Sequence, residues 1–139
     1  MGTRPTTPGL SLFTFALLLV FGGVVHAACE TAVGEFVSIT GSVDVQSTGA
    51  AGWSAAALST QLCEGDTIRV GERSRAAVSL INEAVLRIDQ ATTIRLLDIT
   101  GEAGERSWLD LLNGAIQSFS RKPRLISVNT PYLNGSIEG

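Results

Sequence analysis

The sequence contains one histidine (His26), one lysine (Lys122) and two cysteines among its 139 residues. A Ser-His-Asp or Cys-His catalytic site needs a histidine next to its nucleophile, so this scarcity argues against such an enzyme. Charged residues make up only 17% of the chain, and acidic residues outnumber basic ones by 13 to 10. Nucleic-acid binding needs clustered lysine and arginine, and the only basic cluster lies at residues 121–124. We therefore expect neither an enzyme nor a nucleic-acid-binding protein.

The N-terminal segment is apolar and typical of a secretory signal peptide. Arg4 supplies a positive charge, residues 10–21 form the apolar core, and small residues up to Ala27 form a cleavage site. The rival interpretation is a retained membrane anchor. However, the apolar stretch at residues 10–25 is 16 residues long, and a spanning helix needs about 20. We predict a signal-peptide helix at residues 1–27, cleavage after Ala27, and no stable membrane span in the mature protein.

An exported chain matures in an oxidising compartment and stays in the periplasm or reaches the cell surface. There, an even number of cysteines favours a disulfide, here between Cys29 and Cys63. Two alternatives remain open: Cys29 carries a lipid, or both cysteines are unpaired thiols. A zinc site is disfavoured, because two cysteines without a histidine are too few ligands. We expect no metal and no cofactor.

Apolar and polar residues alternate along much of residues 28–139, which is typical of half-buried β-strands. The clearest run places Val37, Ile39 and Val43 on the inner side of two short strands that are separated by Gly41. Turn signals recur at short intervals throughout this part of the chain. The pattern predicts one all-β domain over residues 28–139, and it does not distinguish a β-solenoid from a β-sandwich.

Glycines mark several of the expected turns. Gly65 and Gly71 lie where a turn favours a positive φ, which glycine adopts without a steric penalty. Asn113 and Gly114 form a strong β-hairpin signal, since both residue types tolerate a positive φ. These residues therefore have an expected structural role at the ends of strands.

Polar side chains next to these turns are expected to stabilise them. Asp66 should accept hydrogen bonds from backbone amides across its turn, and Ser74 should do so more weakly. Thr130 and Pro131 should end a strand, because proline has no amide hydrogen to donate. The rival interpretation pairs Asp66 with Asp89 as carboxylates for catalysis or calcium binding.

From about residue 33 to residue 139 the chain resembles the FecR domain family of exported bacterial proteins. Residues 62–76 are similar to the family pattern L-x-x-G-D-x-[IV]-x-T-G-x-x-S-x-A, with Val70 in place of the usual threonine. Three further pieces follow in the family's order, at residues 86–94, 112–115 and 128–131. The resemblance implies a periplasmic, β-rich domain, rolled into a twisted β-solenoid, that acts through contacts with other proteins.

The best-known members of the family pass a signal from an outer-membrane transporter to a sigma factor. They carry a cytoplasmic sigma-binding segment and a membrane helix before the domain, whereas here the leader is followed directly by the domain. We therefore do not expect a direct anti-sigma role. Residues 132–139 resemble the beginning of the family's next segment, from which we expect a further C-terminal domain in a longer protein.

Two functions fit these observations. The first is an exported module that senses a signal or binds a protein partner in the cell envelope. The alternative is a module that binds envelope glycan or another polymer, with Trp53, Trp108 and Tyr132 stacking on sugar rings. We expect both tryptophans to lie in the core, because large aromatic side chains contribute much of the buried area of a small domain.

Overall fold

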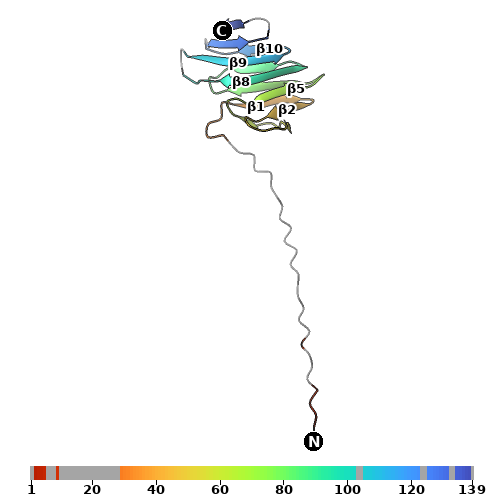
Figure 1. Cartoon of the computed structure of the whole chain (residues 1–139). Helices are drawn as coiled ribbons and strands as arrows, with labels where there is room; N and C mark the ends of the chain where they lie inside the picture. The colour runs from red at the N-terminus through yellow and green to blue at the C-terminus, as the bar shows by residue number, and fades with distance from the viewer. Residues whose placement is uncertain are drawn as a thin grey trace.

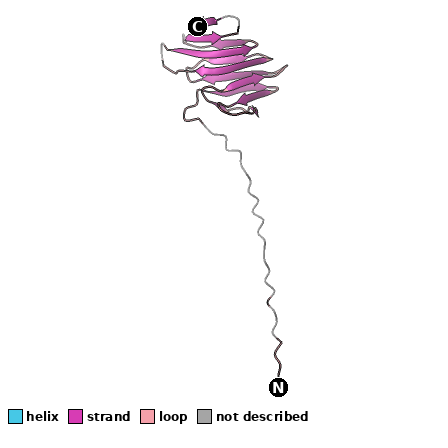
Figure 2. Cartoon of the chain, in the orientation of Figure 1, coloured by secondary structure: helices cyan, strands magenta, loops and turns pink. Residues whose placement is uncertain are grey.

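The structure is a computed structural model that describes residues 2–5, 9, 29–102, 105–122 and 125–131, together with the backbone of residues 134–138. Twelve strands and no helix are found in this part of the chain (Figure 2). Most of the expected signal-peptide helix lies outside the described residues. The described residues contain no helix that is long and apolar enough to span a membrane.

The strands are short and arranged in two sheets. Their bounds are β1 Gly34–Thr40, β2 Val43–Gln46, β3 Ser54–Ala55, β4 Gln61–Leu62, β5 Thr67–Val70, β6 Arg75–Leu80, β7 Val85–Ile88, β8 Thr92–Asp98, β9 Arg106–Asn113, β10 Ile116–Phe119, β11 Leu125–Asn129 and β12 Asn134–Glu138. The five-stranded sheet has the order β10-β7-β6-β1-β4, and the seven-stranded sheet has the order β12-β11-β9-β8-β5-β2-β3.

From its N-terminal to its C-terminal end, the domain is built by a chain that passes repeatedly between the two sheets (Figure 1). Strand β5 lies in the seven-stranded sheet and is followed by β6 and β7 in the five-stranded sheet, after which β8 and β9 return to the first. Almost all pairings are therefore antiparallel. The exception is β9 with β11, which are parallel because β9, β10 and β11 complete one full turn around the domain.

This architecture confirms the predicted all-β class. The two sheets form a roll that is not closed into a barrel. One solenoid-like turn, from β9 to β11, lies at its C-terminal end.

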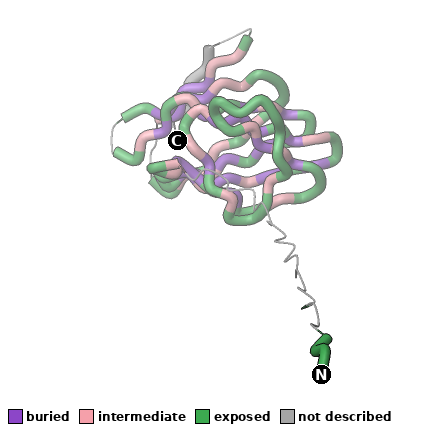
Figure 3. The backbone as a smooth tube through the Cα atoms, turned by 60° about the horizontal axis from the view of Figure 1, so that its bottom comes forward, coloured by how far each residue is buried: buried purple, intermediate pink, exposed green. Residues whose placement is uncertain are grey.

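A single core lies between the two sheets, as the buried segments in Figure 3 show. Both sheets contribute apolar side chains that point inward at every second position, as the pleat of a strand requires. The largest fully buried apolar residues are Phe36, Leu62, Ile68, Leu86, Ile88, Ile94, Leu96, Leu109 and Ile126. Burial of each such side chain stabilises the fold by about 1.5–3 kcal/mol.

The first strand differs from the prediction in its phase. We expected Val37 to face the core, but its side chain is 48% exposed and Phe36 is buried instead. The register of β1 against β6 shifts between Phe36 and Ser38, which is a β-bulge at Val37. The extra residue returns Ile39 to a partly buried position, so alternation resumes after the bulge. Gly41, with φ of +79°, forms the bend between β1 and β2.

Candidate functional site

The buried carboxylate of Asp66 organises the turn between β4 and β5. Asp66 is only 2% exposed, and its Oδ2 accepts a hydrogen bond from the Cys63 amide at 2.8 Å. Its Oδ1 accepts a second one from the Thr48 amide at 2.9 Å, which joins the loop after β2 to the turn. Gly65, with φ of +86°, completes the turn between these groups. Asp66 thus accepts the predicted backbone hydrogen bond across its turn, and it accepts a second one from a distant loop.

In the next turn, between β5 and β6, the predicted backbone conformation of Gly71 is wrong. Gly71 does not have a positive φ; that conformation belongs to Arg73 at +52°. A side chain at position 71 would instead lie 3.3 Å from the carbonyl oxygen of Ser42, to which the Gly71 amide donates a hydrogen bond. Ser74 is 3% exposed; its Oγ accepts from the Ser42 amide and donates to the Glu72 carbonyl. Close approach of two turns, rather than a left-handed conformation, explains the glycine.

The expected hairpin at Asn113 and Gly114 is wrong. Strand β9 lies in the seven-stranded sheet and β10 in the five-stranded sheet, so the turn carries the chain across the core instead of pairing its neighbours. Gly114 has φ of +91°, and an added Cβ would lie 2.6 Å from the Thr92 Cα. Asn113 Nδ2 donates to the Ala91 carbonyl. The turn therefore packs against the β7–β8 connection, which gives it a partner that the local sequence does not reveal.

The remaining predicted residues also have structural positions. Cys29 and Cys63 form a disulfide with a Cα–Cα distance of 5.6 Å. Because this bond occupies the Cys29 sulfur, a lipid on that atom is incompatible with the structure. Thr130 and Pro131 directly follow the last residue of β11. The disulfide joins the segment before β1 to the turn after β4, and Thr130 and Pro131 lie at the end of β11.

Asp66 and Asp89 are not brought together in the structure. Asp66 is buried in its turn, whereas Asp89 is exposed beside Arg75, and no partner is common to both carboxylates. The described part of the chain contains no group of three or more His, Cys, Asp or Glu side chains that could hold a metal ion. The rival interpretation of Asp66 and Asp89 therefore has no geometric support.

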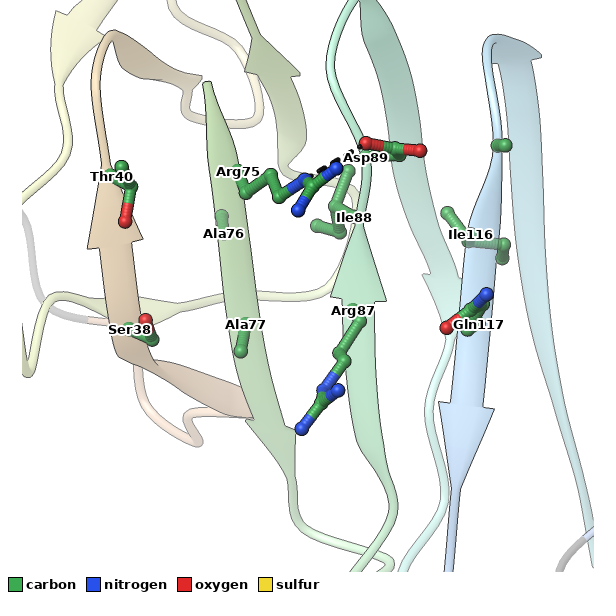
Figure 4. A pocket seen from close by; sticks show the side chains of 11 residues that line it. Ser38, Thr40, Arg75, Ala76, Ala77, Arg87, Ile88, Asp89, Ile116 and Gln117 are labelled. Carbon is green, nitrogen blue, oxygen red and sulfur yellow. Dashed lines mark hydrogen bonds and ion pairs between the residues drawn. The ribbon is translucent and has the colours of Figure 1, made fainter. Parts of the chain in front are cut away.

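A groove of about 550 Å³ crosses the outer face of the five-stranded sheet. Cross-strand pairing explains its position: Ser38 on β1 lies opposite Ala77 on β6, which lies opposite Arg87 on β7, followed by Gln117 on β10. Figure 4 shows these side chains along the four neighbouring strands. The small side chains of Ser38 and Ala77 leave the hollow, because longer side chains line the neighbouring positions.

The electrostatics of the groove are dominated by two arginines. Arg75 donates from Nε to Oδ1 of Asp89 at 3.2 Å (Figure 4). The backbone amide of Gln90, and then the Arg75 guanidinium, hold the pKa of Asp89 below its ordinary value of 3.8. Asp89 is therefore ionised at neutral pH, and the charge that Arg75 faces is lost as the pH falls through the lowered pKa. Arg87 instead places its Cζ 4.9 Å from the centre of the Phe119 ring.

Both tryptophans are exposed, contrary to expectation. Trp108 is 39% exposed, because it alternates in β9 with the buried residues Ser107 and Leu109 and so faces outward. Trp53 is 37% exposed, with the Cζ of Arg69 at 4.1 Å from its ring centre. Arg69 points outward from β5, so both tryptophans lie on the outer face of the seven-stranded sheet. Tyr132 lies outside the described residues.

Of the groove residues, the sequence indicated only Asp89 as a functional candidate, paired with Asp66 rather than with Arg75 or Arg87. Period-two alternation does place Arg75 and Arg87 on the outer side, because Ala76, Leu86 and Ile88 are the inward neighbours. Nothing local indicates that β6 and β7 lie beside β1 and β10. The order of strands in the sheet brings these side chains together.

Comparison with known proteins decides the family. The family model described as FecR protein matches residues 66–139, which is more than half of the chain. This chain belongs to the FecR family. The matched region begins at Asp66 and includes all the groove residues except those on β1. No curated protein and no solved structure matches the chain.

Membership of the FecR family confirms the resemblance that the motifs indicated. FecR is a family of signal-sensing and regulatory modules without enzymatic activity. The expected similarity began at about residue 33, which is earlier than the matched region. Strands β1 and β2 nevertheless pair with β6 and β5, so this earlier part of the chain is continuous with the two sheets of the FecR-matched region.

Proposed function

We propose that this FecR-family chain is an exported, non-enzymatic module that transmits a signal by binding another protein of the cell envelope. The groove on the five-stranded sheet is its docking surface. The observation that supports this most is the groove itself, where small side chains on β1 and β6 leave room between Arg75 and Arg87. Phe119, 48% exposed at one side of this face, adds apolar contact area.

Export is consistent with two features of the chain. The apolar N-terminal segment is of the signal-peptide type, and the Cys29–Cys63 disulfide is a bond that forms and persists in oxidising compartments. A periplasmic or cell-surface location follows from this proposal. The proposal also includes the domain boundary, with a signal peptide at residues 1–27 and a FecR-like β domain at residues 28–139.

Site-specific photo-crosslinking tests the proposed docking surface. A photoreactive phenylalanine derivative at Gln117, which is exposed in the groove, should give one discrete cross-linked protein in the native cell envelope. The matched control places the same derivative at Asp98, which is exposed at the end of β8 in the opposite sheet. Cross-linking at Asp98 should give no such product. The same products at both positions, or none at either, would contradict the proposal.

The exposed tryptophans support a second candidate function, the binding of envelope glycan. Trp53 and Trp108 lie on one face, and Arg69 and Asp44, joined at 2.9 Å, supply polar groups beside Trp53. Aromatic rings with adjacent polar groups provide both apolar contact and hydrogen bonds to a sugar.

Intrinsic fluorescence tests this second candidate, because the chain has only two tryptophans. Added peptidoglycan fragments or envelope polysaccharide should shift the emission of the wild-type protein. Trp53→Phe and Trp108→Phe each leave a single reporter, and both should retain a shift. An unchanged spectrum with every glycan tested would remove this function and leave protein binding unaffected.

A further inference from the structure

The groove on the five-stranded sheet has many hydrogen-bond donors that no described residue uses. The Arg87 side chain makes no hydrogen bond or ion pair among the described residues, and its only polar contact there is with the Phe119 ring. Arg75 uses Nε for Asp89, which leaves both terminal nitrogens available. The Gln117 amide lines the same groove. An arginine presents five N–H groups and no acceptor, so the groove offers donors to a ligand that carries acceptors.

The one acidic side chain that lines the groove, Asp89, is already engaged. Oδ1 of Asp89 already accepts from the Gln90 amide at 2.8 Å and from Arg75 Nε at 3.2 Å. Two guanidinium groups against one carboxylate leave the groove with a positive charge, although the chain as a whole has a net charge of −3. The neighbouring hollow contains Arg121 and Lys122, with Glu83 paired to Lys122 at 3.3 Å. The groove and the hollow beside it therefore carry more basic than acidic side chains, which complements an anionic ligand.

The shape of the groove fits a short extended peptide. Its lining residues come from β1, β6, β7 and β10, which are consecutive in the sheet. At about 4.8 Å between strands, three intervals span about 14 Å. An extended chain rises about 3.3 Å per residue, so this span corresponds to roughly four or five residues.

Other anionic partners fit less well. Nucleic-acid binding depends on many phosphate contacts, and an anionic membrane surface attracts clusters of roughly four to eight lysines or arginines. The groove and the neighbouring hollow together have four basic side chains, and two of these, Arg75 and Lys122, are already paired with an acid. Carboxylate side chains match a guanidinium group in a bidentate manner, so one or two acidic residues would satisfy the site.

We propose that the groove binds an extended acidic segment of the partner protein, with carboxylates on Arg87 and Arg75. This inference rests on the proposed function, since it names the chemistry recognised at the same surface. The backbone of the segment lies over Ser38 and Ala77, where the face is hollowed. Its acidic side chains meet the terminal N–H groups of the two arginines.

A nuclear magnetic resonance titration of the full isotope-labelled chain tests the inference. The probe is a synthetic six-residue peptide that alternates glutamate and valine, and the matched probe carries glutamine in place of glutamate. The glutamate peptide should shift the backbone amides of Ala77, Arg87 and Gln117, and should bind about tenfold or more tightly than the glutamine peptide. Its affinity should fall as salt is raised, because the contacts are ionic.

Variants locate the interaction. Arg87→Glu should weaken binding of the glutamate peptide by about tenfold or more. Arg87→Gln should weaken it less, because it removes the positive charge and the bidentate guanidinium group without adding a negative charge. Arg106→Glu, which makes the same charge change at an exposed position on the opposite sheet, should leave the affinity unchanged. Unchanged circular dichroism of each variant confirms that the fold is intact.

Several results would overturn the inference. Equal affinity for the glutamate and glutamine peptides, or an unaffected Arg87→Glu variant, would contradict it. Shifts of the groove amides with vesicles of anionic phospholipid, but not with the peptide, would identify a membrane surface instead. If Gln117 cross-links a protein partner and the peptide test fails, only the acidic ligand is wrong. If both tests fail, the proposed function fails with it.

Discussion

Replacement of Asp66 with alanine should lower the free energy of unfolding by roughly 3–5 kcal/mol, because a buried carboxylate that bonds two amides is removed. The amides of Cys63 and Thr48 lose their acceptor at 2.8 Å and 2.9 Å, and the site is only 2% exposed to water. Water therefore replaces these bonds poorly. Urea denaturation followed by circular dichroism measures the change.

Two variants separate this effect from a general loss of charge. Asp66→Asn keeps one carbonyl acceptor, so it should cost about half as much as alanine. Asp98→Ala removes an exposed carboxylate from the outer side of β8 and should change stability by less than about 0.5 kcal/mol. Equal losses for Asp66→Ala and Asp98→Ala would show that the turn does not depend on the Asp66 side chain.

Loss of the Cys29–Cys63 disulfide should destabilise the protein by roughly 3–4 kcal/mol, since the bond closes a loop of about 35 residues. The bond also lies beside a short pairing: Gly34 of β1 opposes Leu62 of β4, a strand of two residues. The Val33 amide donates to the Leu62 carbonyl at 2.8 Å. The double variant Cys29→Ala/Cys63→Ala avoids a free thiol and should melt at a clearly lower temperature.

Reduction provides the control for this prediction. Dithiothreitol should lower the stability of the wild-type protein to that of the double variant, and it should not change the variant itself. Ser79→Ala, a small change on the outer side of β6, should leave stability nearly unchanged. A wild-type protein whose stability is unaffected by the reductant would contradict a stabilising disulfide.

The positions of turns could be predicted from the sequence where the interaction is local. Asp66 and Gly65 are near neighbours of the amides and backbone conformation that they serve, so a short motif contains the information. Gly71 was correctly predicted to lie in a turn, but the predicted reason for a glycine there, a positive φ, was wrong. The tight approach of Ser42, distant in the sequence, explains that glycine.

The exposed tryptophans and the bulge at Val37 could not be predicted in the same way. A large aromatic residue is buried only if its strand position faces inward, and Trp108 follows the outward phase of β9. A bulge reverses that phase with one extra residue, so Val37 is exposed and Phe36 buried. Its position depends on pairing with β6, which the residues of β1 alone do not specify.

The amino-acid sequence by itself determined that this FecR-family chain is all-β, and which side of most strands is apolar. Alternation and turn chemistry are properties of a few consecutive residues, and these can be recognised locally. The tertiary structure alone decided that Arg75, Arg87 and Gln117 line one groove with Ser38. Those residues come from four neighbouring strands of one sheet. The order of these strands depends on how the two sheets pack around a common core, and residues from the whole domain contribute to the free energy of that packing.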